Sequence, residues 1–196
     1  MNNITHMDYK ILVCIDCQND FITGSLRNEE AIKAVPKIVD KIRNFNGAAI
    51  YVTRDTHTAD YLKTREGKNL PVEHCIKASW GWQIEDNIQA ALNDAELRRV
   101  KVVYIDKPTF GSHALADSIS STVDYASRLE KETFNPEVEV VGFCTDICVV
   151  SNTLMIKERL YDRATVKVDS SCCAGVTPEL HESALNVMKS CQIEII

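Results

Sequence analysis

The sequence predicts an α/β fold, in which a single three-layer domain carries helices on both faces of a six-stranded parallel sheet. Short apolar runs of the kind found in buried parallel strands alternate with stretches whose apolar residues recur at helical spacing. Several of those runs end directly in charged or polar residues, as central strands do at the carboxyl edge of a doubly wound sheet. The expected strand order is 3-2-1-4-5-6, which makes the first and fourth strands neighbours at the topological switch point.

The first half of the chain contains two expected strands and two expected helices. Residues 10–16 form a continuous apolar run that ends in a carboxylate, which is typical of a central strand. Residues 29–45 keep apolar side chains at helical spacing and predict a helix. A second strand is expected at 48–53. After an irregular stretch at 58–82, a length of loop that often has a function, a helix is expected at 84–92.

The second half repeats the alternation of strand and helix. Residues 100–106 form a third apolar run, and short helical pieces are expected from there to about residue 132. The fourth strand, 137–141, is broken by a glycine, and a helix follows from about 146 to 160. The remaining expected elements are a strand at 164–168, a loop at 170–176, a helix at 178–189 that starts with a proline, and a strand at 192–196.

The composition indicates one globular domain, residues 1–196, and argues against several classes of partner. The net charge is −6 and no basic cluster is present, so nucleic acid is not an expected partner. No apolar run approaches the roughly 18 residues of a membrane span, so no membrane partner is expected. The polar start does not resemble a signal peptide, and several of the 8 cysteines lie in strand-like runs, which predicts reduced thiols in the cytoplasm.

Cys148 is the candidate nucleophile, because it lies where an apolar strand gives way to a helix. Unpaired N–H groups and the dipole at the start of a helix favour a thiolate, and they can also hold an oxyanion. Asp16 and Lys107 lie at the ends of other strands. A carboxylate beside an ammonium can take the proton of a thiol and return it to a leaving group. The alternatives are that Cys148 is a buried core residue, that Asp16 is a carboxylate that caps a loop, and that Lys107 is a solvated surface lysine.

Two histidines and two carboxylates in and before the irregular stretch form a candidate metal site. An Asp-x-His pair at the end of a strand can point both side chains to one face, and such a ligand set suits zinc, iron or manganese. The alternative is a group of hydrogen-bonded loop residues. The four residues are Asp55, His57, Glu66 and His74.

Three motifs resemble those of the isochorismatase-like cysteine hydrolases, and within them the nicotinamidases, over nearly the whole chain. The motifs are Ile15–Phe21, Lys107–Ser112 and Gly142–Val149. The resemblance implies that Asp16 is the general base, that Lys107 is a catalytic lysine and that Cys148 is the nucleophile. It also implies a cis peptide bond between Phe143 and Cys144, and an oxyanion hole formed by the backbone N–H groups of Cys144 and Cys148.

The candidate metal residues match the nicotinamidases, which carry an Asp-x-His, a later histidine and in some members a glutamate between them. The resemblance therefore implies one divalent metal ion, with zinc as the first choice and iron or manganese as alternatives. The chain departs from the common pattern, because Tyr61 stands where many members have a further histidine and Leu70 lies near the place of a tryptophan. Phe21 and Trp80 are expected to wall the substrate pocket.

These features predict hydrolysis of nicotinamide to nicotinic acid and ammonia through a thioester on Cys148, with a metal ion orienting the pyridine ring. The resemblance also suggests a homo-oligomer, either a dimer or a tetramer. One alternative is a related amidase that acts on a ureido, carbamoyl or other small amide, with or without a metal. Another is a non-catalytic protein that binds a small molecule. A dehydrogenase is disfavoured, because no glycine-rich dinucleotide fingerprint follows the first strand.

Overall fold

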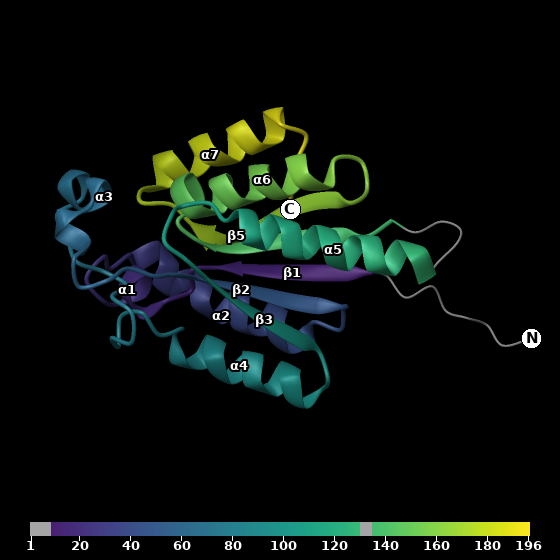
Figure 1. The fold of residues 1–196 in the computed structure, drawn as a ribbon, viewed down its shortest axis with the longest axis horizontal. Helices are drawn as coiled ribbons and strands as arrows, with labels where there is room; N and C mark the ends of the chain where they lie inside the picture. The colour runs from purple at the N-terminus through teal and green to yellow at the C-terminus, as the bar shows by residue number, and fades with distance from the viewer. Residues whose placement is uncertain (1–8, 130–134) are drawn as a thin grey trace, which may run out of the picture.

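A six-stranded parallel sheet forms the centre of the described chain, residues 9–129 and 135–196 of a computed structural model (Figure 1). Its order is β3-β2-β1-β4-β5-β6, which confirms the predicted order. Every neighbouring pair is parallel. The strands are β1 (Lys10–Ile15), β2 (Ala49–Asp55), β3 (Lys101–Lys107), β4 (Glu137–Phe143), β5 (Thr165–Ala174) and β6 (Glu194–Ile195).

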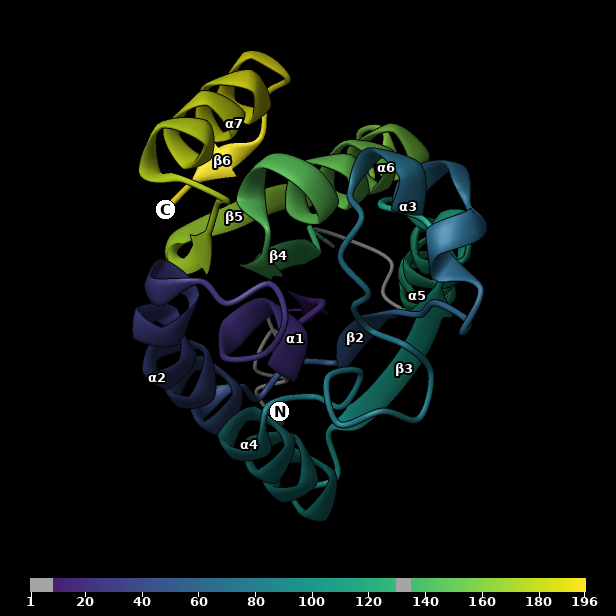
Figure 2. The same cartoon turned by 90° about the vertical axis from the view of Figure 1, so that its left-hand side faces the viewer.

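Helices cover both faces of the sheet, as Figure 2 shows from the carboxyl edge of the strands. The long helices are α2 (Glu29–Asn44), α4 (Asp86–Leu97), α5 (His113–Leu129), α6 (Val150–Leu160) and α7 (Pro178–Ser190). The short elements are α1 (Asn19–Ile22), the 3-10 turn η1 (Tyr61–Lys63), α3 (Arg65–Asn69) and the π-helical turn η2 (Thr145–Val149). Buried residues of α2 and α4 pack on one face of the sheet, and those of α5, α6 and α7 pack on the other.

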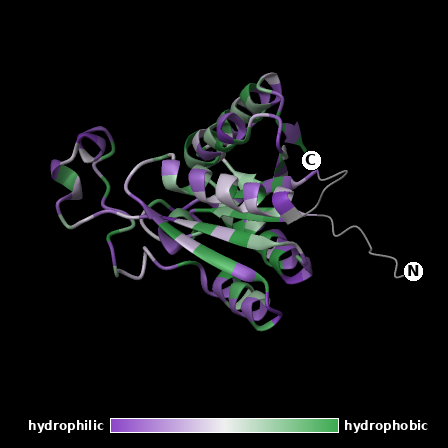
Figure 3. Cartoon of the chain, turned by 45° about the vertical axis from the view of Figure 1, so that its right-hand side comes forward, coloured by the Kyte–Doolittle hydropathy of each residue, from purple (hydrophilic) through white to green (hydrophobic). Residues whose placement is uncertain are grey.

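The sheet separates two apolar cores because strand side chains alternate between its faces. In β1, Leu12 and Cys14 belong to the core beneath α2, whereas Val13 and Ile15 belong to the core beneath α5. The hydropathy of the ribbon follows this arrangement, with apolar strands inside and mixed helices outside (Figure 3). Among the described residues, no helix combines the length and the apolar character that crossing a membrane requires.

Helix α2 illustrates how the sequence specifies these elements. The Asn28 side chain accepts hydrogen bonds from the backbone N–H groups of Glu30 and Ala31, which satisfies two donors of the first turn. Its buried residues recur every three or four positions, so that one stripe of the helix faces the sheet. They are Ala31, Ala34, Val35, Ile38, Val39 and Ile42.

Several elements extend further than the sequence predicts. Strands β2 and β3 continue to Asp55 and Lys107, which are partners in the parallel register. Strand β5 continues to Ala174, so the predicted loop at 170–176 is largely strand. The polar residues there remain extended because Ala174 pairs with Phe143 of β4 beyond an irregularity in the register. The helical pieces predicted up to residue 132 are one helix up to Leu129, and the rest of that prediction lies outside the described residues.

The transition after β4 also differs from the prediction of a helix starting near residue 146. A π-helical turn, η2, comes first, and α6 begins only at Val150. The backbone N–H of Val149 donates to the carbonyl of Cys144, five residues back, which is the wider spacing of a π-turn. Cys148 therefore lies in a widened turn between strand and helix rather than in the first turn of an α-helix.

Gly142 allows β4 to lie against β1 at the end of both strands. Its φ angle is +121°, and a Cβ atom at this position would lie 2.1 Å from the carbonyl oxygen of Ile15. We expect Gly142→Ala to lower the free energy of unfolding by about 2–4 kcal/mol, because it combines an unfavourable backbone angle with a backbone clash.

Urea unfolding followed by circular dichroism measures this loss. Gly111→Ala is the matched control, because the only severe contact of its added Cβ is with the flexible end of the Met155 side chain, at 2.4 Å. Equal losses for the two variants would contradict the assignment of a special backbone role to Gly142.

Candidate active site

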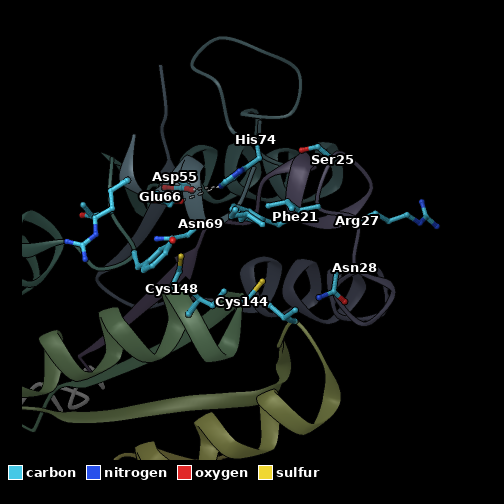
Figure 4. Close-up of a pocket in the computed structure, with 17 residues that line it drawn as sticks. Phe21, Ser25, Arg27, Asn28, Asp55, Glu66, Asn69, His74, Cys144 and Cys148 are labelled. Carbon is cyan, nitrogen blue, oxygen red and sulfur yellow. Dashed lines mark ion pairs between the residues drawn. The ribbon is translucent and has the colours of Figure 1, made fainter. Parts of the chain in front are cut away.

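A cavity of about 1030 Å³ lies at the carboxyl edge of the sheet. Its lining includes Cys144 and Cys148 from the turn after β4, Asp55 from the end of β2, and Glu66 and His74 from the segment that follows β2 (Figure 4). In Figure 4 the two cysteines lie on one side and the carboxylate–histidine group on the opposite side. The structure therefore brings the predicted nucleophile and three of the four predicted metal residues to one cavity, and the fourth, His57, belongs to the same cluster of ligand atoms.

Lys107 lies between the predicted base and the predicted nucleophile. Its Nζ atom is 2.6 Å from Oδ2 of Asp16 and 3.6 Å from Sγ of Cys148. It is also 3.6 Å from Oδ1 of Asp55 and donates to the carbonyl oxygen of Thr109 at 3.1 Å. The Asp16 and Lys107 side chains are 0% and 1% exposed, which contradicts the alternative of a solvated lysine. One ammonium thus contacts both the predicted base and the predicted nucleophile.

Burial and the charges of neighbouring side chains shift the pKa values of Asp16, Lys107 and Cys148. Burial raises the pKa of the Asp16 carboxyl, although the neighbouring Lys107 ammonium opposes the rise. The pKa of Lys107 is raised, because the carboxylates of Asp16 and Asp55 outweigh its burial. Burial and the charge of Asp16 raise the pKa of Cys148 well above its ordinary value. Both effects favour the thiol over the thiolate that the position of Cys148 in the sequence suggested, so the predicted nucleophile calls for a base, the role predicted for Asp16.

Asp16 is held in place by the strand next to it. It follows β1 with a φ angle of +48°, a left-handed conformation that aspartate tolerates better than most residues. The Thr53 hydroxyl of β2 donates to Oδ1 of Asp16 at 2.6 Å and accepts from the Asp16 backbone N–H at 3.1 Å. These two bonds fix the carboxylate and leave Oδ2 directed at Lys107.

The turn that carries Cys148 is tied to the loop after Lys107 by Asn152 of α6. The Asn152 amide donates to the carbonyl oxygens of Phe110 and Cys148 and accepts from the backbone N–H of Ser112.

The peptide bond between Phe143 and Cys144 is cis, as the resemblance implies. The assignment of the backbone N–H groups of Cys144 and Cys148 to an oxyanion hole remains a prediction.

Asp55, His57, Glu66 and His74 form one cluster whose ligand atoms lie within 4.8 Å of one another. Nε2 of His57 is 3.0 Å from Oδ2 of Asp55 and 3.6 Å from Oε1 of Glu66. Nε2 of His74 is 3.5 Å and 3.8 Å from the same two oxygens. These spacings suit one small cation, since the ligand atoms of tetrahedral zinc, with bonds of about 2.1 Å, lie roughly 3.4 Å apart.

Two further observations fit a metal ion at this cluster. Oε1 of Glu66 is buried and has no hydrogen-bond partner among the described residues, as expected of an atom that awaits a ligand. Nδ1 of His74 lies 2.9 Å from the carbonyl oxygen of Val72 and so carries a proton, which leaves Nε2 as the ring nitrogen that faces the cluster and would bind a metal. The residues present therefore fit a divalent cation.

Asp55 contacts both the buried Lys107 and the histidines of the candidate metal site. Its Oδ1 faces the Lys107 ammonium, and its Oδ2 faces the two histidines. Burial raises the pKa of this carboxyl, but hydrogen bonds from His57 and His74 and the charge of Lys107 outweigh burial, so its pKa is lowered. Asp55 is therefore ionised and available as a ligand.

The two aromatic residues predicted to wall the pocket lie in different places. Phe21 lines the cavity, and its ring lies 5.7 Å from that of His74 in an edge-on arrangement. Trp80 does not line it: its side chain is 55% exposed, and its backbone carbonyl accepts a hydrogen bond from Asn19. The prediction for Trp80 is wrong because a residue in an irregular loop gives no periodicity from which to read its direction.

Sequence reasoning missed three residues that support the site. Gln18 is buried and bonds both the backbone N–H and the carbonyl of Asp55. Asn152 joins the two catalytic loops, as described above. Tyr61 packs against both histidines, with ring centroids at 4.6 Å and 4.8 Å, and its hydroxyl donates to the carbonyl oxygen of Leu70. The signal in the sequence that points to the first two is their place, since Gln18 lies inside the motif Ile15–Phe21 and Asn152 follows closely after the motif Gly142–Val149.

Known proteins resemble this chain over nearly its whole length. It is 26% identical to the nicotinamidase of Saccharomyces cerevisiae, over 95% of this chain and 99% of that protein. The structure matches a nicotinamidase/pyrazinamidase of Bacillus subtilis with a TM-score of 0.73 at 26% identity, covering 95% and 98% of the two chains. It also matches a pyrazinamidase of Pyrococcus horikoshii, solved in complex with zinc, with a TM-score of 0.68 at 25% identity, covering 95% and 98%.

A model of the isochorismatase domain family matches residues 10–196. That match includes every strand of the sheet, the cluster of Asp16, Lys107 and Cys148, and the four candidate metal residues. The chain therefore belongs to the isochorismatase family.

Proposed function

We propose that this protein hydrolyses nicotinamide to nicotinic acid and ammonia. The observation that carries the proposal is the arrangement of one cavity, in which a thiol with its acid–base partner lies opposite a cluster suited to a metal. A planar ring with a carboxamide on one side and a basic nitrogen on the other is complementary to such a cavity. The nicotinamidases among its relatives, named above, support this choice of substrate.

The residues of the chain account for each proton in the reaction. Asp16 takes the proton of the Cys148 thiol, and the sulfur attacks the carboxamide carbon while backbone N–H groups of Cys144 and Cys148 hold the oxyanion. Asp16 then gives the proton to the departing nitrogen, so that ammonia leaves and a thioester remains. Asp16 next removes a proton from water, which attacks the thioester carbon. Asp16 returns this proton to the departing sulfur, which restores the thiol of Cys148 as the acid is released.

Lys107 keeps Asp16 ionised between these transfers, because its ammonium lies 2.6 Å from the carboxylate. Asp55, His57, Glu66 and His74 would hold one divalent ion, for which we propose zinc, with iron and manganese as alternatives. When bound, this ion supplies a Lewis acid for the pyridine nitrogen and thereby orients the ring. Zinc in the Pyrococcus horikoshii relative supports this choice.

A cytoplasmic location and a homo-oligomer, either a dimer or a tetramer, remain predictions. All 8 cysteines are free thiols, which supports a reducing compartment. Size-exclusion chromatography with light scattering measures the oligomeric state.

Replacing the nucleophile tests the chemistry. We expect Cys148→Ala to reduce ammonia release from nicotinamide by at least about a thousandfold, because Cys148 is the cysteine of the cavity whose sulfur contacts Lys107, at 3.6 Å. Cys191→Ala is the matched control, since Cys191 is the exposed member of the 8 cysteines and lies outside the cavity. Turnover of Cys148→Ala at the rate of the control would refute covalent catalysis.

Replacing a metal residue separates binding of the ring from chemistry. We expect His57→Ala to lose most of its bound metal, and to raise KM for nicotinamide by more than it lowers kcat, because the ring loses its anchor. Elemental analysis and steady-state kinetics measure the two effects. His113→Ala, at an exposed histidine that starts α5, is the matched control. A metal-free His57→Ala protein with full activity would contradict the role of the cluster.

A further inference from the structure

Asp20 of α1 is a buried carboxylate that has no role in the reaction described above. It is 8% exposed, and within residues 9–129 and 135–196 it forms no ion pair. A carboxylate in such surroundings costs free energy unless hydrogen bonds replace those to water. Two backbone N–H groups provide them, because Ser25 donates to Oδ1 at 3.0 Å and Cys75 donates to Oδ2 at 2.7 Å. The two donors belong to separate segments of the chain.

The bond to Cys75 borders the candidate metal site. The N–H of Cys75 belongs to the peptide group that follows His74, so this bond fixes the backbone directly beside a candidate metal ligand. The carbonyl oxygen of Cys75 accepts from the backbone N–H of His57 at 3.0 Å. Cys75 has a φ angle of +48°, which residues other than glycine rarely adopt. Asp20 therefore helps to hold an uncommon backbone conformation that adjoins both histidines of the cluster.

The bond to Ser25 borders the cavity wall. Residues 25–28 all line the cavity, and Figure 4 labels three of them beside His74 and Phe21. The backbone carbonyl of Asp20 also accepts from the N–H of Leu26, at 2.9 Å. One residue thus bonds both the loop 25–28 and the peptide group after His74. These two parts of the cavity wall are joined through its carboxylate.

Two glycines enclose the Asp20 carboxylate. A Cβ atom at Gly24 would lie 2.3 Å from Oδ1, and a Cβ atom at Gly81 would lie 2.0 Å from Oδ2 and 2.3 Å from Oδ1. A side chain at either position would therefore push the carboxylate away from its present bonds. The surroundings of Asp20 fit the carboxylate closely and leave it little room to move.

We propose that Asp20 is a positioning residue that orients His74 for the metal ion and couples metal binding to the order of loop 25–28. This inference rests on the proposed function, in which the candidate metal site holds one divalent ion. A cation bound by the His74 side chain restrains the peptide group after that residue, and the Asp20 carboxylate passes this restraint to the N–H of Ser25. Asp20 acts through the backbone and takes no part in the proton transfers.

Titration of the full-length protein with zinc, in competition with a chelating dye, tests the effect on the metal site. We expect Asp20→Ala, which removes both acceptor oxygens, to raise the zinc dissociation constant by at least about tenfold, because groups that orient metal ligands contribute that much to affinity. Asp60→Ala is the matched control, since Asp60 is an exposed carboxylate of the same irregular stretch and pairs with Lys63. A dissociation constant equal to that of the control would overturn the proposal.

Gly81→Ala separates positioning from a general loss of stability, and it tests the proposal independently should Asp20→Ala fail to fold. Its added Cβ displaces the carboxylate without removing it. Gly47→Ala is the matched control, because its Cβ would lie 2.4 Å from the carbonyl oxygen of Lys10, outside the cavity lining. We expect both variants to unfold at a lower temperature, but only Gly81→Ala to bind zinc at least about tenfold more weakly. Equal zinc dissociation constants in the two variants would overturn the proposal.

Amide hydrogen exchange measured by NMR tests the coupling to the loop. In the unchanged protein, zinc should slow exchange at the Ser25 amide by at least about tenfold, because the bond from this amide to Asp20 opens less often. In Asp20→Ala and in Gly81→Ala, zinc should leave this exchange unchanged. Equal slowing in the unchanged protein and the variants, or no slowing in the unchanged protein, contradicts the coupling.

The outcomes also separate this proposal from the proposed function, because neither measurement depends on turnover. Nicotinamide turnover together with unchanged zinc binding in Asp20→Ala leaves the proposed function standing and overturns the role of Asp20. Weakened zinc binding in the variants of a protein that releases no ammonia from nicotinamide supports the role of Asp20 and refutes the substrate. Failure of the unchanged protein to bind zinc overturns both the metal site and this proposal.

Discussion

The buried ammonium of Lys107 is the interaction on which the rest of the site depends. Removing a charge from water costs several kcal/mol unless opposite charges compensate for it, and Lys107 is 1% exposed. The compensating carboxylates come from Asp16, at 2.6 Å, and Asp55, at 3.6 Å. These residues end or follow β1, β2 and β3, which are neighbours in the sheet. The strand order is therefore the condition that lets the three charges meet.

Asp55 connects this ion cluster to the candidate metal site. Because one of its oxygens faces Lys107 and the other faces His57 and His74, a cation bound by the histidines and Lys107 would lie on opposite sides of a single carboxylate. The proposed anchor for the ring and the proposed acid–base pair are thus electrostatically linked and not two independent sites. Because Asp55 contacts both Lys107 and the candidate metal residues, the distance between the proposed binding site for the ring and the proposed site of proton transfer is fixed. A fixed distance holds an amide substrate in the position that the reaction needs.

The parts of this arrangement that follow from local sequence were predictable. Apolar runs with polar ends identify the strands, and their common carboxyl edge brings Asp16, Lys107 and Cys148 together. Contacts between distant segments were not predictable in the same way. The continuation of β5 to Ala174 depends on pairing with β4, and the outward position of Trp80 depends on the path of an irregular loop. Local propensity contains neither kind of information.

The pairing of Asp55 with Lys107 makes the position of an edge strand a determinant of catalysis. Side chains of a strand alternate between its faces, so a slip of β3 by one residue would turn the ammonium to the opposite side of the sheet and place Asp106 beside Asp55. One rung earlier, Arg54 and Asp106 form an ion pair of 2.7 Å, and Arg54 also stacks on the ring of Trp82 at 4.1 Å. The contacts of Arg54 with Asp106 and Trp82 are partly exposed, and they favour the observed register of β3. They therefore help to keep the Lys107 side chain on the side of the sheet where the site lies, although none of the three residues belongs to that site.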